Sequence, residues 1–487
     1  MLTVEDNELL TRVGPGTPMG DLLRRYWTPA LLSTELPEPD CPPVRVRLLG
    51  EDMVAFRDTN GDVGLFVQAC PHRGASLFFG RNEEAGLRCV YHGWKFDTTG
   101  SCFDMPSEPA ESNFKTKVRV KAYPTHESGG VIWTYMGPPE TMTGFRDFGT
   151  ESLPKEDWSA SRTYSTCNWV QSMEGNMDTA HISWLHQYFG ILDTEDDGTD
   201  RPGYASNAMS WKFWAHDRAP RLEIEDTWYG YKYAGIRTTP NGHTHVRISA
   251  FAIPYTTVVA TTPFGMGGGL FVPIDDESCW RWFFATTSMR KFMQDPVFLQ
   301  GSLLGPSQPA HQPYGFLVAN NQDQKRDSSE PIVRRPTTSA TLPMREWRPD
   351  NDYKIDRDLQ KDTLYTGITN FVSQDMMVTE SAGAIWDRSQ EHLGTTDKSI
   401  IKLRAILIKA AKDLANGIEP PATDPGLPYK SIRSAEKVLA PGEDWRILGT
   451  DEDPTVIEKL GLRDAAEAPA AGSAARREQG QRAFWFR

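Results

Sequence analysis

Short runs of β-branched and aromatic residues alternate with turn signals between about residues 44 and 137. The runs are VRVRL, MVAFRD, DVGLFV and GGVIWTYMG, with partial alternation of apolar and polar positions. Asn60-Gly61, Thr99-Gly100 and Gly129-Gly130 supply dipeptides that favour turns between strands. This part of the chain is therefore predicted to be a small all-β module.

Helical periodicity and strands are mixed elsewhere. The first 40 residues are predicted to be helical, because Thr17 and Pro18 form a helix-start signal. Thr17 offers a capping side chain, and Pro18 lacks only an N–H that would have no partner in the first turn of a helix. Beyond residue 150, helix-period segments accompany strands such as HVRISAFAI and CWRWFFATTS, which predicts an α+β domain. We therefore divide the chain into an N-terminal helical segment (1–40), an all-β domain (41–150), an α+β domain (151–462) and an alanine-rich, loose C-terminal tail (463–487).

The composition is typical of a globular protein without a membrane span. The 487 residues favour two or three domains, and apolar runs such as IIKLRAILI fall far short of the roughly 20 residues that cross a bilayer. A formal net charge of −13 disfavours nucleic acid and anionic membranes as partners. The N-terminus MLTVEDNELL lacks a basic, apolar leader and six cysteines are too few for a disulfide framework, so a cytoplasmic location is expected.

Two of the cysteines are closely followed by histidines. Cys70 precedes His72 by two residues, and Cys89 precedes His92 by three. Two thiolates and two imidazoles suit a tetrahedral zinc ion, or a [2Fe–2S] cluster in which the cysteines hold one iron and the histidines the other. Zinc ligands are usually two to four residues apart, and a tight Cys-x-His followed by a gap of 16 residues is unusual for them. The pattern favours the cluster over zinc.

A second group of polar residues lies in CNWVQSMEGNMDTAHISWLH, residues 167–186. Read as a helix from Asn168, this segment has an apolar and a polar stripe on opposite sides. The apolar stripe, which indicates a core contact, consists of Trp169, Met173, Met177 and Ala180. The polar stripe, typical of either a solvated face or a metal site, consists of Gln171, Glu174, Asp178 and His181.

The spacing within this stripe indicates a metal site. Asp178 and His181 are one helical turn apart, so the carboxylate can accept an imidazole N–H, as happens at many metal-binding histidines. His186 follows five residues later, a step that rotates by about 140° in a straight helix. Both histidines can share a metal only if the helix ends or kinks near Ser183-Trp184. A further carboxylate would complete a 2-His-1-carboxylate iron site, and nearby acids are candidates.

Together, these motifs resemble the α-subunit of Rieske non-haem iron ring-hydroxylating oxygenases of the phthalate-dioxygenase type. The resemblance rests on the Cys-x-His and Cys-x2-His pairs, on NWVQSMEGNMDTAHISWLH, on DRSQEHLGTTD, and on NELLTRVGPGTPMGDLLRRYWTPAL near the start. Respiratory Rieske proteins carry extra cysteines and a serine near the cluster, whereas the corresponding positions here look like Ala75, Tyr91 and Trp94. The resemblance therefore favours a cluster that accepts electrons from a reductase.

The resemblance implies two cofactors and their ligands. Cys70, His72, Cys89 and His92 would hold a Rieske [2Fe–2S] cluster, and the catalytic domain would contain a helix-grip-like antiparallel sheet. The stretch NFVSQDMMVTESAGAIWDRSQEHLGTTD is similar to the family segment that carries the third ligand of a mononuclear Fe(II). The predicted iron ligands are His181, His186 and Asp375, with Glu380 as the second choice for the carboxylate.

The family also implies how electrons move. In a homotrimer, or a hexamer of two stacked trimers, His72 or His92 of one subunit approaches Asp178 of the next. Asp178 would then be both an electron bridge and the residue that orients His181, and Asn176 belongs to the same catalytic motif. Because the chain has no Gly-x-Gly-x-x-Gly and no cysteine quartet for a plant-type cluster, a separate NAD(P)H-dependent reductase is expected.

The resembled subgroup acts with O2 on aromatic carboxylates such as phthalate, chlorobenzoates and phenoxybenzoates. An arginine is suited to bind the carboxylate, and Arg247 is the first candidate, because it alternates with the apolar Val246 and Ile248. Arg221 is the second candidate, although each of these arginines is also compatible with a surface position. A monooxygenase that demethylates a methoxy aromatic acid, and a Rieske electron carrier without oxygenase activity, remain alternatives to cis-dihydroxylation.

Overall fold

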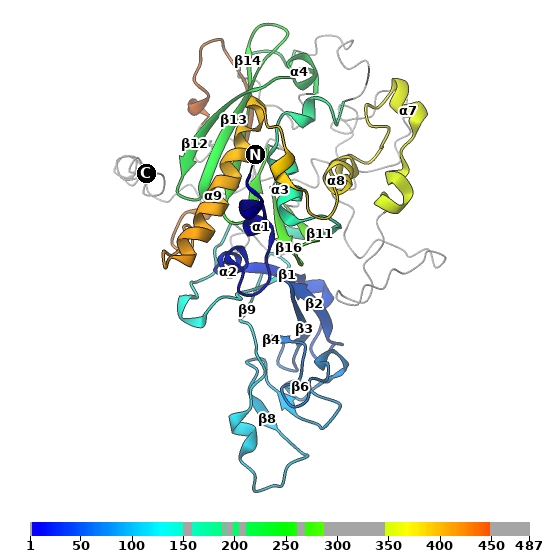
Figure 1. Cartoon of the computed structure of the whole chain (residues 1–487), viewed down its shortest axis with the longest axis vertical. Coiled ribbons are helices and arrows are strands. Elements are labelled where there is room, and N and C mark those ends of the chain that lie inside the picture. Colours follow the sequence, from blue (N-terminus) through cyan, green and yellow to red (C-terminus); the bar gives the residue numbers. More distant parts are fainter. Residues whose placement is uncertain are drawn as a thin grey trace.

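The chain forms an elongated molecule with a narrow all-β part below a broader part of sheet and helices (Figure 1). The computed structural model describes residues 2–149, 158–187, 189, 198–203, 211–260, 268–286 and 346–448. The predicted tail, 463–487, lies outside the described residues. No helix among the described residues is long and apolar enough to span a bilayer.

The N-terminal segment is helical only in part. Helices α1 (Val4–Thr11) and α2 (Pro18–Arg24) both pack against α9 (Lys398–Ala415). The predicted cap is confirmed, because the Thr17 hydroxyl accepts the Gly20 amide at 3.1 Å and Pro18 opens α2. The expectation of helix throughout residues 1–40 was wrong at β1 (Thr28–Leu32), which pairs with β10 (Val131–Thr134). Pro29 would interrupt a helix, whereas an edge strand tolerates it.

The all-β prediction for the following segment is confirmed. Three small sheets form it, with strand orders β1-β10-β9, β2-β3-β4 and β5-β6-β7-β8. The predicted turns at Asn60-Gly61, Thr99-Gly100 and Gly129-Gly130 connect β3 to β4, β7 to β8 and β9 to β10. The strands are β2 (Val44–Leu48), β3 (Glu51–Arg57), β4 (Val63–Val67), β5 (Arg81–Glu83), β6 (Gly86–Arg88), β7 (Lys95–Phe96), β8 (Cys102–Asp104) and β9 (Thr125–Ser128).

An eight-stranded antiparallel sheet forms the larger part of the molecule. Its strands follow the order β11-β17-β16-β15-β14-β13-β12, and β18 pairs with the free part of the β14 edge. The predicted strands HVRISAFAI and CWRWFFATTS correspond to β14 and β17. The strands are β11 (Trp158–Ser165), β12 (Arg221–Thr227), β13 (Gly230–Thr238), β14 (Thr244–Ala252), β15 (Thr256–Val258), β16 (Gly268–Pro273), β17 (Cys279–Thr286) and β18 (Ala435–Leu439).

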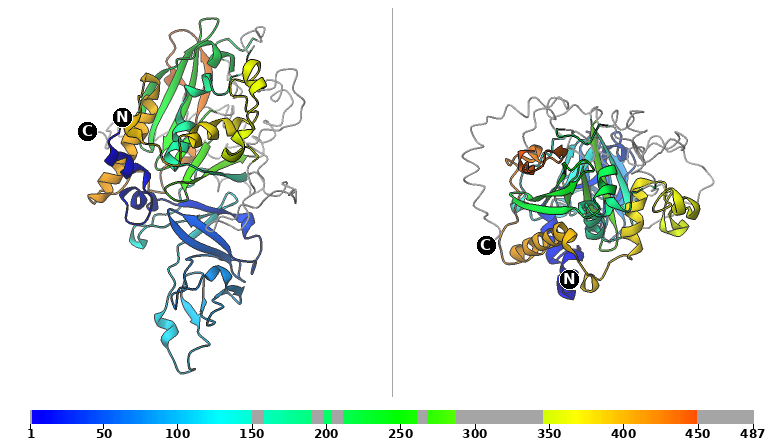
Figure 2. Two further views of the ribbon diagram at one scale, coloured as in Figure 1. Left: turned by 45° about the vertical axis from the view of Figure 1, so that its right-hand side comes forward. Right: turned by 90° about the horizontal axis from the view of Figure 1, so that it is seen from above.

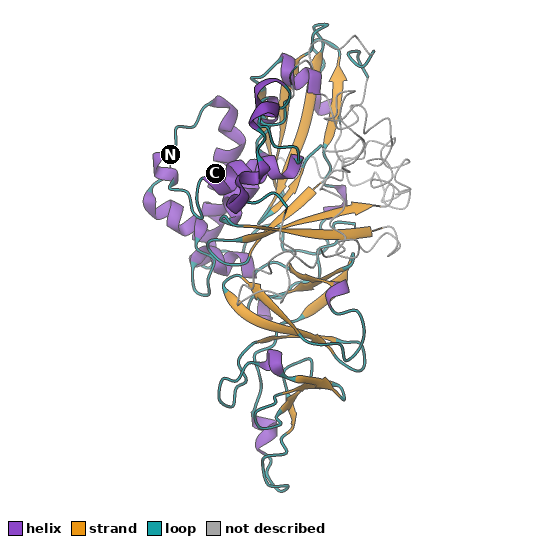
Figure 3. Ribbon diagram, turned by 90° about the vertical axis from the view of Figure 1, so that its right-hand side faces the viewer, coloured by secondary structure: helices purple, strands orange, loops and turns teal. Residues whose placement is uncertain are grey.

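Helices cover one face of this sheet, as the side and top views show (Figures 2 and 3). Helix α3 (Trp169–Met177) contacts the middle strands, and α9 contacts β12 and β13. Buried tyrosines of β13 join the layers, because Tyr231 donates to the Ser399 carbonyl at 2.7 Å and Tyr233 to the Met177 carbonyl at 2.8 Å. The α+β fold class is therefore confirmed. Three more α-helices lie in the described parts of the chain: α4 (Trp211–His216), α7 (Arg357–Asp362) and α8 (Phe371–Ser381).

Candidate metal centres

The two Cys–His loops of the all-β part share one backbone geometry. In each loop the cysteine amide donates to the carbonyl five residues ahead, at 2.8 Å, and a glycine amide returns a bond to the cysteine carbonyl, at 2.9 Å. These glycines, Gly74 and Gly93, have φ of 74° and 77°, a region that glycine occupies without strain. The loops therefore present Cys70 and Cys89, and the histidines that follow them, in equivalent ways.

The two cysteine side chains lie next to each other, and so do the two histidine rings. The thiols of Cys70 and Cys89 are buried and adjacent, and burial together with the Cys89 thiol raises the pKa of Cys70 to about 11. The rings of His72 and His92 lie 4.4 Å apart, and the buried Nδ1 of His92 finds no hydrogen-bond partner among the described residues.

This arrangement fits a two-iron cluster better than a single ion. A tetrahedral zinc would draw all four ligand atoms to one point. Within the described part of the chain, the only set of three or more such ligand atoms that lie within 4.8 Å of one another is elsewhere. Two thiols on one side and two imidazoles on the other match a [2Fe–2S] cluster with mixed ligands.

The second candidate centre begins where helix α3 ends. The helix ends before the predicted break near Ser183-Trp184, because α3 ends at Met177 and Asp178 is its C-cap. The two oxygens of Asp178 accept the amides of Ala180, at 2.7 Å, and of His181, at 3.3 Å. This side-chain turn competes with helix continuation and leads into a 3-10 turn at His181–Ser183. The predicted break therefore exists, five to six residues earlier than expected.

The break brings His181 and His186 to a carboxylate from a distant helix. Asp375 on α8 places Oδ1 3.1 Å from His186 Nε2 and 3.5 Å from His181 Nε2. The three ligand atoms all lie within 4.8 Å of one another. Two imidazoles and one carboxylate on one side of a metal are the ligand set of non-haem Fe(II) sites with open positions.

Glu380, the second choice for the carboxylate, lies elsewhere. Its Oε1 accepts the Ser165 hydroxyl at 3.0 Å and the Thr166 amide at 2.9 Å, and its other oxygen accepts the Tyr353 hydroxyl. These bonds tie α8 to the end of β11. The structure therefore brings Asp375, and not Glu380, to the histidines.

Charge balance in this group suits a cation. Burial lowers the pKa of His181, but hydrogen bonds and charge from Asp178 and Asp375 outweigh it and raise this pKa to about 9. The pKa of Asp375 lies well below its usual range, because the charges of the two histidines outweigh its burial. The two carboxylates therefore stabilise positive charge on His181, a charge that a bound Fe(II) would supply instead.

Gln374 orients the buried ring of His186, and the sequence reasoning missed it. Its Oε1 lies 2.7 Å from His186 Nδ1, and its Nε2 donates to the Ile368 carbonyl at 2.6 Å. Since the Ile368 carbonyl can only accept, the amide group is fixed with its oxygen toward His186. His186 therefore donates its Nδ1–H to Gln374, and Nε2 is the ring atom that lies beside Asp375 and would bind a metal. The only sequence signal was the position of Gln374 beside the predicted ligand.

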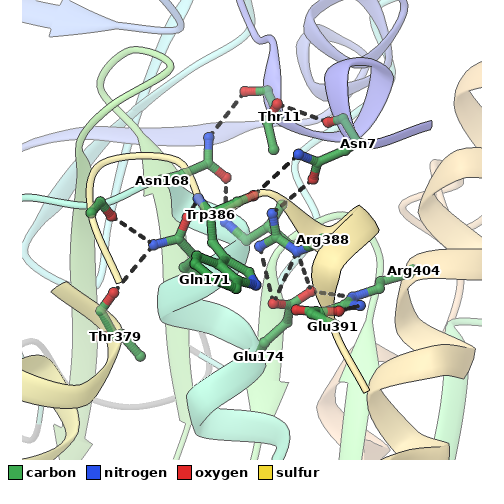
Figure 4. Close-up of polar contacts among 12 residues, drawn as sticks. Asn7, Thr11, Asn168, Gln171, Glu174, Thr379, Trp386, Arg388, Glu391 and Arg404 are labelled. Atoms are coloured by element: carbon green, nitrogen blue, oxygen red, sulfur yellow. Dashed lines mark hydrogen bonds and ion pairs between the residues drawn. The ribbon is translucent and has the colours of Figure 1, made fainter. Parts of the chain in front are cut away.

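The N-terminal half of the polar stripe, Gln171 and Glu174, does not lie at the metal site with Asp178 and His181. Glu174 is enclosed by the guanidinium groups of Arg388, at 3.0 Å, and Arg404, at 2.6 Å (Figure 4). Gln171 donates to the carbonyls of Thr379 and Gly383. These side chains are neither a solvated face nor part of the metal site. They fix α3 against α8, α9 and the segment that connects those helices.

The apolar stripe of this segment is largely confirmed, since Trp169, Met173 and Met177 are fully buried while Ala180 is half-buried.

Asn176, expected in the catalytic motif, instead accepts the Thr257 hydroxyl of β15 at 2.6 Å.

The two arginines proposed for substrate binding have different surroundings. Arg247 on β14 is 6 % exposed, and its Nη2 donates to the Ala260 carbonyl at 3.2 Å. The side chain of Arg221 on β12 is 65 % exposed and pairs with Glu223 of its own strand. Arg221 therefore lies on the surface, and we withdraw it as a candidate.

Family models match most of the chain. The description "Rieske [2Fe-2S] domain" matches residues 26–124, and "LigXa C-terminal domain like" matches residues 134–297 and 337–465. The 3-chlorobenzoate-3,4-dioxygenase oxygenase subunit of Comamonas testosteroni is 36% identical over 91% of this chain and 97% of its own length. The phthalate 4,5-dioxygenase oxygenase subunit of Pseudomonas putida is 35% identical over 92% and 94%. The 5,5'-dehydrodivanillate O-demethylase oxygenase subunit of a Sphingobium strain is 30% identical over 89% and 87%.

Solved structures agree with the fold. Dicamba monooxygenase bound to dicamba aligns with a TM-score of 0.50 over 81% of this chain and 99% of its own, at 16% identity. The NdmA QL mutant of Pseudomonas putida CBB5 with caffeine aligns with a TM-score of 0.51 over 88% and 99%, at 17% identity. A [2Fe–2S] cluster and a mononuclear iron are the cofactors of this fold and of these relatives. The chain belongs to the Rieske non-haem iron oxygenases, as an oxygenase subunit of the phthalate-dioxygenase type.

Proposed function

We propose that this protein is the terminal oxygenase that uses O2 and reductase-supplied electrons to hydroxylate, by cis-dihydroxylation, an aromatic carboxylate. Phthalate-like, chlorobenzoate-like and phenoxybenzoate-like compounds are the substrate class. The observation that carries the proposal is the convergence of His181, His186 and Asp375 on one point, on the sheet face that also bears a buried arginine. The names of the relatives support the same substrate class.

Each residue of the iron site has a defined task in this proposal. His181, His186 and Asp375 bind the iron, which when loaded supplies dioxygen activation with electrons from the cluster. Gln374 holds His186 in the tautomer that can bind, and Asp178 holds the backbone turn that carries His181. The cluster ligands are Cys70, His72, Cys89 and His92.

Arg247 is the proposed anchor for the substrate carboxylate. It lies opposite Gly235 in the β13–β14 register, so both residues face the same side of the sheet. A Cβ on Gly235 would lie 2.9 Å from the side chain of Thr179, which directly follows Asp178. Arg247 therefore reaches the layer of the iron site. Its Nε has no hydrogen bond to a described residue and forms only a long ion pair with Glu436, at 3.8 Å, which a closer substrate carboxylate would replace.

Substitution of Arg247 tests this assignment. We expect Arg247→Met to raise KM for the carboxylate substrate by at least about tenfold, since a charged hydrogen bond contributes about 1.5–3 kcal/mol. The same ring without its carboxylate should be bound equally by both proteins. Arg221→Met is the matched control and should leave KM unchanged. Equal KM values for wild type and Arg247→Met would refute the anchor.

Demethylation of a methoxy aromatic acid is the second candidate, because one relative is an O-demethylase oxygenase subunit. Product analysis separates the two reactions, since dihydroxylation gives a cis-dihydrodiol and demethylation releases formaldehyde. The third reading, an electron carrier without oxygenase activity, requires only the two irons of the cluster. Three irons per chain, with substrate-dependent oxygen uptake over a panel of aromatic acids, are the outcome that supports an oxygenase.

The proposed assembly is a homotrimer, or two stacked trimers, joined head to tail. Strand β6, which leads into the loop of Cys89 and His92, lies in the narrow all-β part, well apart from α3 and α8, at which the iron site lies (Figure 1). Exposed apolar side chains adjoin both sites: Tyr91 beside His92, and Trp184 between the two iron histidines. A ring in which one copy's Tyr91 surface meets the next copy's Trp184 surface would bring His92 toward Asp178, whose side chain is 24 % exposed. Asp178 would then carry electrons between subunits.

Electrons come from a separate NAD(P)H-dependent reductase. The protein acts in the cytoplasm, which is consistent with six cysteines that form no disulfide. The division at residues 40, 150 and 462 remains our proposal for the domain limits.

A further inference from the structure

A group of buried polar side chains lies on the sheet face that carries Arg247. In the strand register Arg247 pairs with Glu436 of β18, and residues that pair directly face the same side of a sheet. His245, two positions before Arg247 on β14, and its partner Arg237 on β13 face that side as well. These four side chains, none more than 8 % exposed, form what we call the arginine cluster: Arg237, His245, Arg247 and Glu436.

An aromatic wall connects the arginine cluster to the iron site. The ring of His186, an iron ligand, contacts Trp211 at 6.3 Å, and Trp211 contacts Trp214 at 5.0 Å. The guanidinium group of Arg247 lies 5.7 Å over the Trp214 ring. The cluster therefore belongs to the layer in which the proposed substrate binds, and its charges act on that substrate.

The two arginines of the cluster differ in what they already bind. Arg237 donates to the backbone carbonyls of Asp217, at 3.1 Å, and Thr179, at 2.6 Å, so it supports the turn that precedes His181. Within the described part of the chain, Arg247 donates one hydrogen bond, to the Ala260 carbonyl. Arg237 is therefore a structural support, whereas Arg247 is available to a ligand.

Glu436 is the fixed carboxylate of the cluster. Its Oε1 lies 2.8 Å from His245 Nε2, and its side chain is 2 % exposed. Its other oxygen lies 3.8 Å from Arg247 Nε. The pKa of His245 lies below its ordinary value, because burial outweighs the favourable contact with Glu436. His245 is therefore neutral near pH 7, and it positions the Glu436 carboxylate without cancelling its charge.

The described residues of the cluster carry one positive charge in excess. An arginine is cationic near pH 7, and this holds for Arg237 although burial and the charge of Arg247 lower its pKa to about 10. Against these two cations stands the single carboxylate of Glu436. The half-buried Asp217 acts on Arg237 less strongly than Arg247 and Glu436 do. The cluster therefore matches one further carboxylate.

We propose that Glu436 is a specificity-determining residue that restricts the substrate to aromatic acids with a single carboxylate. This inference rests on the proposed function and narrows its substrate class. One carboxylate on Arg247 balances the charge of the cluster. A second carboxylate on the same ring would add a buried negative charge near the fixed charge of Glu436, and a buried charge without a counter-ion is strongly unfavourable. Glu436 would thus select by repulsion, while Arg247 selects by attraction.

Pairs of acids with the same shape and different charge test the proposal. A nitro group is planar like a carboxylate but adds no net charge, so 2-nitrobenzoate matches phthalate and 3-nitrobenzoate matches isophthalate. Calorimetric titration of the oxidised holoprotein gives the Kd of each acid without turnover. We expect wild type to bind the nitrobenzoate at least about tenfold more tightly than the dicarboxylate in at least one pair, and in neither pair to favour the dicarboxylate.

Two substitutions at position 436 separate charge from shape. In Glu436→Gln, which keeps the size and can still bond His245, the tenfold preference should fall below about threefold, because the dicarboxylate binds more tightly. Glu436→Asp keeps the charge and should keep the preference. Glu443→Gln, at an exposed position of the segment that follows β18, is the matched control and should behave as wild type. Iron content, sulfide content and thermal unfolding check that each variant is intact.

The outcomes separate this inference from the proposed function. Equal or tighter binding of both dicarboxylates by wild type would overturn the inference, even if Glu436→Gln does not fold. An unchanged preference in Glu436→Gln, or its loss in Glu436→Asp, would also overturn it. In each of these cases an aromatic acid still binds, so the proposed function stands. If none of the four acids binds to wild type, the proposed function is refuted and this inference with it.

Discussion

Single side chains with two hydrogen-bonding ends determine the geometry of the iron site. Asp178 could be predicted from the sequence, because its three-residue separation from His181 is a local relation. Gln374 could not, since its partner His186 is 188 positions away and only the packing of α8 brings them together. The carboxylate ligand of the iron site could not be predicted from local spacing either. Spacing alone left several acids open, and family resemblance was needed to select Asp375.

Replacement of Asp178 by asparagine tests its proposed role as an electron bridge. Asparagine keeps the side-chain shape and can still accept the Ala180 amide, but it loses the negative charge beside His181. We expect Asp178→Asn to retain both the cluster and the mononuclear iron, with product formation at least about a hundredfold lower. Iron and sulfide content, the cluster's spectrum and product yield measure this. Full activity with both metals present would refute the bridge.

Replacement of Gln374 by leucine tests whether it orients His186. Leucine keeps the approximate size but leaves His186 Nδ1–H buried without an acceptor. We expect Gln374→Leu to lower the affinity for Fe(II) by about 10–100-fold, while the cluster stays intact. Gln374→Glu, which still offers an acceptor, should recover most of the binding. If Fe(II) titrations of wild type and Gln374→Leu coincide, the hydrogen bond does not position the ligand.

At the scale of elements, helix α3 shows both the strength and the limit of pattern analysis. Its apolar stripe was predicted, because burial follows the helical period. Its end was misplaced, because the turn formed by Asp178 outweighed the preference to continue the helix. The polar stripe divides between two environments. Glu174 meets arginines more than 200 positions away, a relation that no local pattern contains.

The Glu174 network predicts a dependence of stability on pH. Burial raises the pKa of Glu174, but Arg388 and Arg404 outweigh it, so its pKa in the folded protein lies below the ordinary 4.5. The ionised carboxylate therefore stabilises the fold above about pH 4.5, and this contribution is lost as pH falls through the lower, folded-state pKa. We expect Glu174→Gln to unfold with about 3–5 kcal/mol less free energy at pH 7, as for a broken buried ion pair.

Thermal and denaturant unfolding at several pH values measure this difference. The gap between wild type and Glu174→Gln should narrow as the solution is acidified. Glu8→Gln is the control, because Glu8 forms an exposed pair with Arg12 and should contribute less than about 1 kcal/mol. Equal stability of wild type and Glu174→Gln at pH 7 would show that the network is not a stabilising feature.

At the scale of the molecule, the sequence predicted the order of an all-β part and an α+β part, but not how distant strands pair. The strand at Thr28–Leu32 was missed because its partner, β10, lies about 100 positions later. The addition of β18 to the β14 edge spans a still longer separation. The subunit contacts could not be predicted from residue patterns either, because the exposed Tyr91 and Trp184 belong to no periodic pattern in the sequence.

The proposed ring predicts a defined mass in solution. Sedimentation equilibrium should give three or six times the chain mass of 54.7 kDa. Charge reversal near Trp184, as in Arg218→Glu, which removes the cation lying 4.4 Å above the Trp184 ring, should weaken this assembly. A stable monomer that retains full turnover would contradict transfer between subunits.

Complementation between two inactive subunits tests transfer across the subunit boundary. One variant, Cys70→Ser/Cys89→Ser, should lack the cluster, and the other, His181→Ala/His186→Ala, should lack the mononuclear iron. Neither should form product alone, but mixed trimers purified through two different tags should regain a substantial part of wild-type turnover. Product from these mixed trimers is the predicted result. Assembled mixed trimers that hold both metals and yet form no product would contradict it.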